Sequence, residues 1–396
     1  MIAKKMVKLV EGSSVIRAMF EEGKKMAAEF GAENVYDFSL GNPSVEPPAG
    51  VKNAMIRTLE EENPNYLHGY MNNAGYEDVR AAIAAHINKE QGTNFNENNI
   101  IMTVGAAGGL NVMLKTLLDP EDEVVVFAPF FGEYSNYVAN YDGKLVVVPP
   151  NTETFMPDME AFASLITPKT KVVIMNTPNN PTGVVYSEDT LKELAKVMEE
   201  KEKEFNTSIY LLSDEPYREL VYGDITVPYA TKYYQNTIVG YSYSKSLSLP
   251  GERIGYLVIP SDVDDYEDVF GAASVATRIL GFVNAPSLQQ RAIMACLEEK
   301  VDVSIYDRNR RLLVDSLKGM GFECANPDGA FYLFLKTPVD DKEFTKKAKE
   351  YHLLVVPGQT FGCAGYVRIS YCVDYDMIVR SLPAFEKMAQ EYGLKR

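Results

Sequence analysis

Seven short runs of apolar and β-branched residues recur between about residue 50 and residue 260, and longer amphipathic stretches separate them. The runs read NIIMTV, DEVVVFA, KLVVVP, KVVIMN, SIYLLSD, TIVGYS and RIGYLVI. Most of them are apolar at consecutive positions, which is typical of strands buried on both faces of a largely parallel sheet. The pattern therefore predicts an α/β domain.

The stretches between the runs carry helical periodicity, and SEDTLKELAKVMEEKEK is the clearest example. Ser187 at its start is a suitable helix N-cap. Apolar residues follow at the i, i+3, i+4 and i+7 spacing of one helix face, at Leu191, Leu194, Ala195 and Met198. Strands that alternate with such helices indicate a sheet flanked by helices.

The regular alternation ends at about residue 290. A long helical stretch is predicted over 289–317, and FYLFLK, a helix near 341–350, the short strand LLVV, the strand GYVRISY and a final helix follow it. This order predicts a smaller α+β domain. We predict three parts in the chain: an N-terminal segment 1–50 that completes the small domain, a large domain 51–290 and a small C-terminal domain 291–396.

The balance of charge limits the classes of partner. The chain has 55 acidic and 39 basic side chains, which give a net charge of −16. A negative surplus of this size repels phosphate backbones and anionic membranes, so we expect neither nucleic acid nor a membrane as a partner. The N-terminus has no uninterrupted apolar core and no run of about 18 apolar residues occurs, which favours a cytoplasmic protein.

Cysteine, histidine and serine patterns exclude several chemistries. Reduced thiols are expected because no CxxC spacing occurs among Cys296, Cys324, Cys363 and Cys372. The three histidines, His68, His86 and His352, lie far apart and form no HExxH pattern, so no metal site is predicted. No GxSxG motif is present, which argues against a Ser-His-Asp hydrolase.

Polar residues follow several predicted strands, at the edge where ligands bind in open α/β sheets. The glycine-rich turn TVGAAGGL runs into an apolar helix, and free amides at such a helix start bind phosphate. NTPNNPTG follows KVVIM, SDEPY places Asp214 at a strand tip, and SYSK places Lys245 at the next one. Each feature alone also has a structural explanation: close packing of small residues, Asx turns, a helix N-cap or a solvated loop.

Taken together, these features describe one binding site. A helix N-terminus, the two serines of SYSK and the arginine that follows them in SLSLPGERIG suit a phosphate group, and an aspartate suits a basic ring nitrogen. A lysine offers an amine for a Schiff base. Pyridoxal 5′-phosphate is the cofactor that uses all of these groups, and the sequence therefore predicts an enzyme that depends on it.

The sequence resembles the class I/II aminotransferases, the fold-type I pyridoxal-phosphate enzymes that include the aspartate aminotransferases. The resemblance runs over nearly the whole chain. It rests on LGNP at 40–43, GYMNNAGYEDVR at 69–80, TVGAAGG, APFFGEY, NNPTG, SDEPYREL, SYSKSLSLPGERIGY and VRISY, in that order. It implies a large domain with a mostly parallel sheet flanked by helices, which binds the cofactor, and a smaller α+β domain.

The resemblance implies roles for the residues around the cofactor ring. Lys245 is expected to hold the cofactor as a Schiff base and then to shuttle the substrate proton. Asp214 is expected to pair with the pyridine nitrogen and keep it protonated. Tyr217 and Asn180 would hydrogen-bond the phenolic oxygen of the ring, and Phe131 would stack on its face.

Further residues are implied for the phosphate group. Arg253 would bind it through two hydrogen bonds, together with the hydroxyls of Ser242 and Ser244. Backbone amides at the helix start would complete this part of the site, at Gly105, Ala106 and Ala107. Tyr70 matches a family tyrosine that reaches across from a neighbouring subunit, which implies a homodimer with shared active sites that the segment 1–50 also contacts.

Substrate contacts are implied as well. Arg368 of VRISY would bind the α-carboxylate, and Gly41 of LGNP and Asn180 would lie beside that carboxylate. One aspartate-using branch of the family carries a lysine after the glycine of its TVG turn, where this chain has alanine. Another branch uses an arginine donated by the neighbouring subunit, shortly before an N-P element, and Arg278 in ATRILGFVNAP occupies a comparable place. The resemblance thus makes Arg278 the candidate for a distal carboxylate. Aspartate or glutamate, with a 2-oxo acid as acceptor, is the leading expectation, and a surface ion pair remains the alternative for Arg278.

Other reactions remain open at this point. A C–S lyase or an amino-acid decarboxylase would use the same lysine, aspartate and arginine, because the reaction follows from which Cα bond aligns with the ring. A non-enzymatic pyridoxal-binding regulator is a further hypothesis. Such regulators add a basic helix-turn-helix domain, and this acidic chain begins almost directly with the enzyme-like region.

Overall fold

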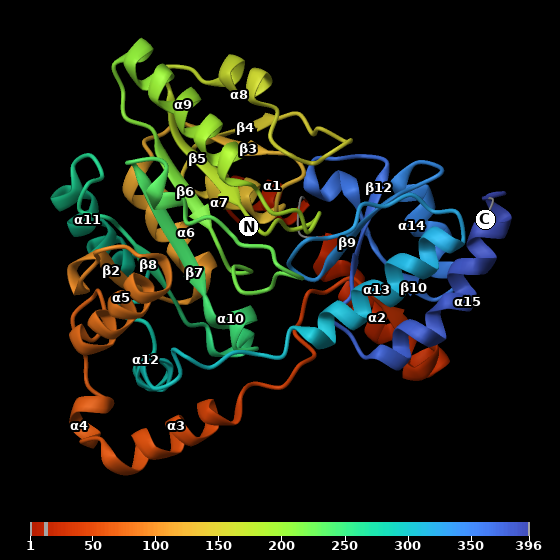
Figure 1. Cartoon of the computed structure of the whole chain (residues 1–396), viewed down its shortest axis with the longest axis horizontal. Helices are drawn as coiled ribbons and strands as arrows, with labels where there is room; N and C mark the ends of the chain where they lie inside the picture. The colour runs from red at the N-terminus through yellow and green to blue at the C-terminus, as the bar shows by residue number, and fades with distance from the viewer. Residues whose placement is uncertain (1, 12–14, 395–396) are drawn as a thin grey trace.

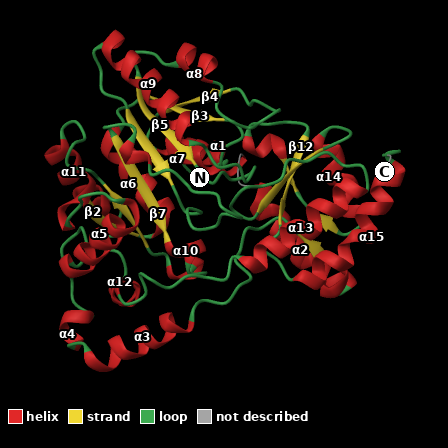
Figure 2. Cartoon of the chain, viewed as in Figure 1, coloured by secondary structure: helices red, strands yellow, loops and turns green. Residues whose placement is uncertain are grey.

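The structure is a computed structural model that describes residues 2–11 and 15–394, with the side chains of 8, 11, 15–18 and 20 left out. The predicted N-terminal segment 1–50 therefore lies partly outside the described residues. Figures 1 and 2 show a larger part built on one sheet and a smaller part beside it, joined through irregular segments. Among the described residues, no helix is both long and apolar enough to cross a membrane.

Seven strands form the central sheet. In spatial order they are β2 (Ile100–Thr103), β8 (Gly255–Val258), β7 (Thr237–Ser242), β6 (Tyr210–Asp214), β5 (Thr170–Asn176), β3 (Glu123–Phe127) and β4 (Lys144–Val148). The five strands from β7 to β4 run parallel, and β8 is antiparallel to both of its neighbours. The predicted α/β fold with a mostly parallel sheet is confirmed.

Helices cover both faces of this sheet (Figure 2). One face packs against α6 (Gly105–Leu117), α7 (Glu133–Asn140) and α11 (Tyr266–Ile279). The other face packs against α5 (Glu77–Gln91), α8 (Met159–Leu165), α9 (Glu188–Phe205) and α12 (Ser287–Met294), and α3 (Ala49–Glu61) packs against α12. The N-cap expected for α9 is present, because the Ser187 side chain accepts a hydrogen bond from the amide of Thr190.

The residues of β3 show why the strands are apolar at consecutive positions. Val124 and Val126 belong to the core on one face, and Val125 and Phe127 belong to the core on the other. The period of two in a strand sends neighbouring side chains to opposite faces. The edge strand β4 differs: Val147 is exposed, so the expectation of burial on both faces is wrong for KLVVVP, which has a neighbouring strand on one side alone.

The smaller part contains a three-stranded antiparallel sheet in the order β11-β12-β9. Its elements are β9 (Tyr332–Lys336), β11 (Val356–Pro357), β12 (Tyr366–Ser370), α13 (Ser304–Gly319), α14 (Asp341–Glu350) and α15 (Tyr375–Glu391). A separate pair joins the two ends of the chain, since β1 (Tyr36–Asp37) runs parallel to β10 (Leu353–Leu354). The predicted strand LLVV is thus divided between two sheets.

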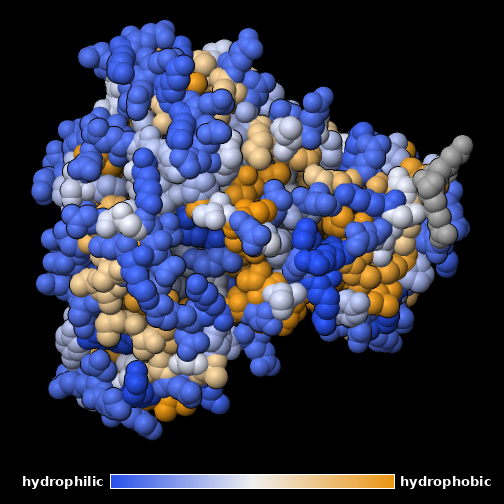
Figure 3. Space-filling model, in the orientation of Figure 1, coloured by the Kyte–Doolittle hydropathy of each residue, from blue (hydrophilic) through white to orange (hydrophobic). Residues whose placement is uncertain are grey.

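The remaining elements are short or peripheral. They are α1 (Lys4–Glu11), α2 (Val15–Phe30), α4 (Pro64–Leu67), α10 (Tyr243–Ser246) and the 3₁₀ turns Ala32–Asn34, Glu97–Asn99, Ala230–Lys232, Pro250–Glu252 and Gly358–Phe361. Figure 3 shows one face of the molecule, where hydrophilic residues cover the outer helices. Hydrophobic residues gather near the middle of this face, between the larger and the smaller part.

The long helix predicted over 289–317 is wrong as one element. The helix α12 ends at Met294 and α13 begins at Ser304, with turns and extended chain between them. Residues on the two sides belong to different hydrophobic cores, Ile293 to that of the large sheet and Leu313 to that of the smaller part. A straight helix could not fill both cores, because its apolar face points in one direction.

Candidate functional site

A cavity of about 330 Å³ lies at the carboxyl ends of β5, β6 and β7, between the large sheet and β9 and β12. Most of the residues that the sequence singled out line it: Gly41, Ala106, Ala107, Phe131, Asn180, Asp214, Tyr217, Ser242, Ser244, Lys245, Arg253 and Arg368. They come from segments more than 300 residues apart in the chain. Open α/β sheets bind their ligands at this edge, where the loops after the strands meet.

Asp214 is the last residue of β6 and is almost fully buried. The hydroxyl of Tyr134 donates a hydrogen bond of 2.5 Å to its Oδ2, and Asn176 donates to its backbone carbonyl at 2.9 Å. Its other oxygen, Oδ1, is buried without a partner. Burial raises the pKa of Asp214 to about 7, and the Tyr134 hydrogen bond acts in the opposite direction. The carboxylate therefore has one free acceptor for a cationic N–H group.

Lys245 lies in α10, the single helical turn that follows β7. Ser242 caps this turn by accepting a hydrogen bond of 3.1 Å from the amide of Ser244. The amine of Lys245 donates to the carbonyl of Gly41 at 2.6 Å and lies 5.2 Å from the centre of the Phe331 ring. The short cap thus holds the lysine at the strand tip, with its amine inside the cavity.

The pKa of Lys245 is lowered to about 8, mainly because burial disfavours the charged amine. The guanidinium groups of Arg368 and Arg253 lower it further, and the thiol of Cys372 acts in the opposite direction. An amine with such a pKa is partly neutral near neutral pH, which a nucleophile or a general base requires.

The corner of the cavity beside α6 is built for an anion. Gly105 begins α6 with φ +69°, and a Cβ atom there would lie 2.8 Å from Nη2 of Arg253. The guanidinium of Arg253 is exposed and donates to the carbonyl of Pro250 at 2.9 Å. The hydroxyls of Ser242 and Ser244 lie 2.7 Å apart at the same corner. A helix start, two hydroxyls and a guanidinium are suitable donors for a phosphate.

Arg368 of β12 approaches from the opposite side of the cavity and is 2% exposed. It donates to Oδ1 of Asn180 at 3.0 Å and to the carbonyl of Ser39 at 2.6 Å, and its Nε has no partner. Burial lowers its pKa. Within the described part of the chain, no carboxylate forms an ion pair with it. A buried guanidinium without a counter-charge is a suitable site for the carboxylate of a ligand.

Two tyrosine hydroxyls lie between these groups. The hydroxyls of Tyr217 and Tyr332 are 2.9 Å apart, and the ring of Tyr332 stacks under Arg368 with 4.5 Å between the guanidinium carbon and the ring centre. A Cβ atom at Gly41 would lie 2.0 Å from the Tyr332 hydroxyl, so glycine is needed at this position. Burial raises the pKa of Tyr332 to about 12, so it stays protonated as a donor.

Three of the singled-out residues do not line this cavity. Gly105 is not a lining residue, although it lies next to Arg253, which is one. Tyr70 is 93% exposed, and Arg278 is exposed in the last turn of α11. The cavity of a single chain therefore forms without Tyr70 or Arg278.

Sequence reasoning missed several residues that shape the site. Tyr134 and Tyr332 stand inside motifs that had been noted, APFFGEY and FYLFLK, but neither received a role. Asn176 precedes NNPTG by three positions and holds both Asp214 and the amide of Asn180. Alternate residues in a strand share a face, so the position of Tyr332, two residues from the buried Phe334, indicates that its side chain is buried as well. The sequence does not indicate which residue its hydroxyl contacts.

The residues present fit pyridoxal 5′-phosphate. The orphan Oδ1 of Asp214 suits a protonated ring nitrogen, the amine of Lys245 suits an aldehyde, and the Arg253 corner suits a phosphate. No set of three or more His, Cys, Asp or Glu side chains among residues 2–11 and 15–394 could hold a metal ion. The four cysteines are free.

Comparisons with known proteins agree with this arrangement. The model of the family aminotransferase class I and II matches residues 33–382. The aspartate aminotransferase of Pyrococcus horikoshii is 32% identical over 387 residues, which cover 94% of each chain. The crystal structure of an amino transferase from Eubacterium rectale is 46% identical, covers 99% of both chains and has a TM-score of 0.96.

A second solved structure, the aspartate aminotransferase from Thermus thermophilus with maleate, is 27% identical with a TM-score of 0.86 and covers 98% of this chain and 99% of that chain. The likeness thus extends over both parts of the fold. This chain belongs to the class I and II aminotransferases.

Proposed function

We propose that the chain transfers the amino group of an L-amino acid, with aspartate or glutamate as leading candidates, to a 2-oxo acid in the cavity around Lys245. Membership of the class I and II aminotransferases gives the reaction type, and with it the cofactor pyridoxal 5′-phosphate. Two of the similar proteins named above are aspartate aminotransferases, which supports the choice of a dicarboxylic substrate.

One observation carries the assignment of the site. A single cavity holds an amine with a lowered pKa, a buried carboxylate oxygen without a partner and a buried guanidinium without a counter-charge, at Lys245, Asp214 and Arg368. Leaving buried polar groups unpaired costs stability, so their gathering in one place favours a bound ligand as the missing partner.

The bound cofactor supplies an aldehyde that condenses with an amine and a ring that withdraws electrons from the substrate Cα. Lys245 is proposed as the residue that holds the cofactor and then moves the proton from Cα. Its pKa of about 8 allows the neutral amine to accept that proton near neutral pH. Asp214 would hold the proton on the ring nitrogen through its unpartnered Oδ1, with Tyr134 fixing the orientation of its carboxylate.

Arg368 is proposed to bind the substrate α-carboxylate. Its Nη atoms are fixed by Asn180 and Ser39, so the guanidinium does not need to reorganise when the substrate arrives. Fixing the carboxylate sets the direction of the Cα–H bond relative to the amine of Lys245. The carbonyl of Gly41, which accepts from that amine, lies at the same end of the cavity.

The remaining residues are proposed to hold the cofactor. Arg253, Ser242, Ser244 and the amides of the α6 start bind the phosphate, with Gly105, Ala106 and Ala107 as the start of that helix. Tyr217 and Asn180, which line the cavity, would hydrogen-bond the phenolic oxygen, and Phe131 would stack on the ring.

We also propose a homodimer in the cytoplasm. Tyr70 is exposed, and exposed apolar residues occur on the neighbouring α3 and α4, at Ile56, Leu59 and Tyr66. An exposed apolar patch of this kind favours a protein interface. In such a dimer Tyr70 and Arg278 would serve the partner's cavity. We also propose the division of the chain into 1–50, 51–290 and 291–396. The pairing of β1 with β10 supports it, because this pairing joins the N-terminal segment to the C-terminal one.

A half-reaction separates aminotransfer from other reactions at the same site. Purified enzyme with bound cofactor is mixed with one amino acid at a time, without a 2-oxo acid. We expect aspartate or glutamate to yield one equivalent of the matching 2-oxo acid per site, after which the reaction stops until an acceptor is added. Continuous release of pyruvate, ammonia or CO₂ without an acceptor would instead identify a lyase or a decarboxylase.

A further inference from the structure

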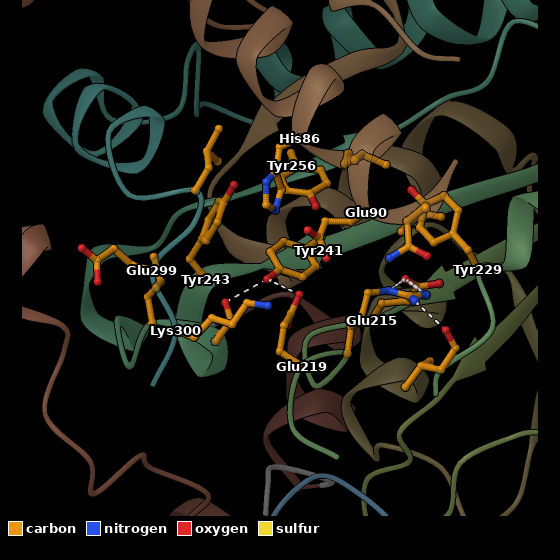
Figure 4. Close-up of a pocket in the computed structure, with 18 of the residues that line it drawn as sticks. His86, Glu90, Glu215, Glu219, Tyr229, Tyr241, Tyr243, Tyr256, Glu299 and Lys300 are labelled. Carbon is orange, nitrogen blue, oxygen red and sulfur yellow. Dashed lines mark hydrogen bonds and ion pairs between the residues drawn. The ribbon is translucent and has the colours of Figure 1, made fainter. Parts of the chain in front are cut away.

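A second cavity of about 330 Å³ lies beside the first one, and the two share no lining residue. The short helix α10 separates them: Ser244 and Lys245 face the candidate active site, whereas Tyr243 and Ser246 line the second cavity. Figure 4 shows that its walls come from α5, β7, β8, the segment after β6 and the segment after α12. The proposed aminotransfer uses none of these side chains.

Aromatic rings form the walls of this cavity, from Tyr229, Tyr241, Tyr243 and Tyr256. Tyr241 and Tyr256 are stacked with 4.7 Å between their ring centres, and Tyr243 meets Tyr241 edge-on at 5.2 Å. The faces of such rings carry partial negative charge and attract cations, most strongly where water is excluded. The guanidinium of Arg218 already lies over the Tyr229 ring, 4.8 Å from its centre, so the rings left for a positively charged ligand are the other three.

A carboxylate at the wall, that of Glu219, has one oxygen without a hydrogen-bond partner (Figure 4). Oε1 of Glu219 accepts a hydrogen bond of 2.8 Å from the Tyr241 hydroxyl, but Oε2 is buried without a partner. The guanidinium of Arg218 is hydrogen-bonded to Glu215 and to the carbonyl of Val227, so it acts on Glu219 through its charge and not through a hydrogen bond. Burial raises the pKa of Glu219, and the hydrogen bond from Tyr241 and the charge of Arg218 act in the opposite direction.

The mouth of the cavity carries further charge. Glu90 and Glu299 are exposed there and contribute negative charge, and the exposed Lys300 contributes one positive charge. The Glu215–Arg218 pair is neutral as a unit. Among the described residues, three glutamates, Glu90, Glu219 and Glu299, thus form no ion pair inside the cavity, whereas Lys300 is the one exposed lysine that lines it. This surplus of acidic groups gives the cavity a negative potential.

We infer that this second cavity binds a small organic cation of the ammonium type, with its charge against Glu219 and the tyrosine rings. A metal ion is a poor alternative because no set of three or more ligating side chains exists within the described residues. A cavity of this volume is large enough for a quaternary ammonium group with a short tail.

Choline is a suitable probe because its quaternary nitrogen cannot condense with the aldehyde of the cofactor. Its carbon isostere 3,3-dimethylbutan-1-ol has the same shape without the charge. Titration calorimetry on the enzyme with bound cofactor should show one choline site per chain and no binding of the isostere. Equal binding of both compounds, or no choline binding at millimolar concentrations, would overturn the inference.

Variants locate the site. Glu219→Gln keeps the side-chain shape and removes the charge, so choline affinity should fall roughly tenfold. Lys300→Gln removes a repulsive charge at the mouth and should raise the affinity roughly two- to threefold. Glu193→Gln, on an exposed face of α9, is the matched control and should leave affinity unchanged.

Should Glu219→Gln fail to fold, the exposed rim provides the decisive variant. The double change Glu90→Gln and Glu299→Gln leaves the buried wall intact and should weaken choline binding several-fold. Unchanged affinity in the rim double variant and in Lys300→Gln, or in a folded Glu219→Gln, would contradict the inference. Aminotransfer activity is measured in the same samples, so loss of the choline site and loss of the proposed function can be told apart.

Discussion

The hydroxyl of Tyr134 donates a 2.5 Å hydrogen bond to one oxygen of Asp214 and leaves the other oxygen free toward the cavity. The two residues are 80 positions apart and meet where α7 packs on the tip of β6. One neutral hydrogen-bond donor fixes the orientation of a buried carboxylate, but it only partly stabilises the ionised form. Its protonation is therefore sensitive to that single hydrogen bond.

Replacing Tyr134 with phenylalanine should raise the pKa of Asp214 above its value of about 7 in the cofactor-free protein. Only the ionised carboxylate attracts a protonated ring nitrogen, so cofactor affinity should fall as pH drops through that pKa. In Tyr134→Phe the midpoint of this fall should move up by roughly one pH unit. Cofactor binding to the cofactor-free protein, titrated from pH 5.5 to 9, measures it.

Tyr186→Phe is the control for that experiment, because Tyr186 is also buried in the large part but does not line the cavity. In Tyr186→Phe the pH midpoint of the fall in cofactor affinity should match that of the unaltered protein. If Tyr134→Phe shows that same midpoint, the hydrogen bond to Asp214 does not tune the site.

Gly105→Ala should weaken cofactor binding roughly tenfold, because the new Cβ would lie 2.8 Å from the Arg253 guanidinium and displace it from the phosphate corner. Gly92→Ala is a matched control. Both glycines have a positive φ, +69° and +63°, so both changes carry similar backbone strain, but the Cβ at Gly92 meets nothing. Equal cofactor affinity in the two variants would contradict the role of the corner.

Arg368→Lys should raise KM for the amino acid roughly 10- to 100-fold, since lysine keeps the charge but loses the paired hydrogen bonds to a carboxylate. The cofactor spectrum should stay unchanged, which separates this effect from misfolding. Arg310→Lys, whose guanidinium is paired with Asp307 outside the cavity, should leave KM unaltered. An unchanged KM in Arg368→Lys would place the substrate carboxylate elsewhere.

Arg278→Ala tests substrate choice. Arg278 is exposed on α11 and outside the cavity of its own chain, so we expect it to act on substrate through the proposed dimer. We expect kcat/KM for aspartate and glutamate to fall roughly tenfold or more, with kcat/KM for alanine unchanged. Arg380→Ala, an exposed arginine of α15, should change neither value. An equal loss of kcat/KM for all three amino acids would show that Arg278 does not determine substrate specificity.

Much of the site could be predicted because it follows the strand tips. Asp214 ends β6 and Lys245 follows β7, and adjacent parallel strands bring their carboxyl ends to the same edge of the sheet. The alternation of strands and helices likewise predicted the large sheet. These are local patterns, which the order of residues along the chain records directly.

Other features depend on contacts between distant segments. The pairing of Tyr217 with Tyr332 spans 115 positions, and that of Arg368 with Asn180 spans 188. No spacing rule links such residues, so Tyr134 and Tyr332 received no role. The end of α12 before Ser304 could not be predicted either, because the residues between α12 and α13 continue a helical pattern in the sequence. In the structure the chain passes there from one hydrophobic core to another.

The most direct test of the central claim is to fix the cofactor on its lysine with sodium borohydride and to map the modified peptide by mass spectrometry. We expect one cofactor per chain, attached to Lys245, and in Lys245→Ala neither attachment nor the visible absorption band, with activity lowered roughly a thousandfold or more. Attachment to a different lysine, or a normal band and activity in Lys245→Ala, would contradict the assignment of the site.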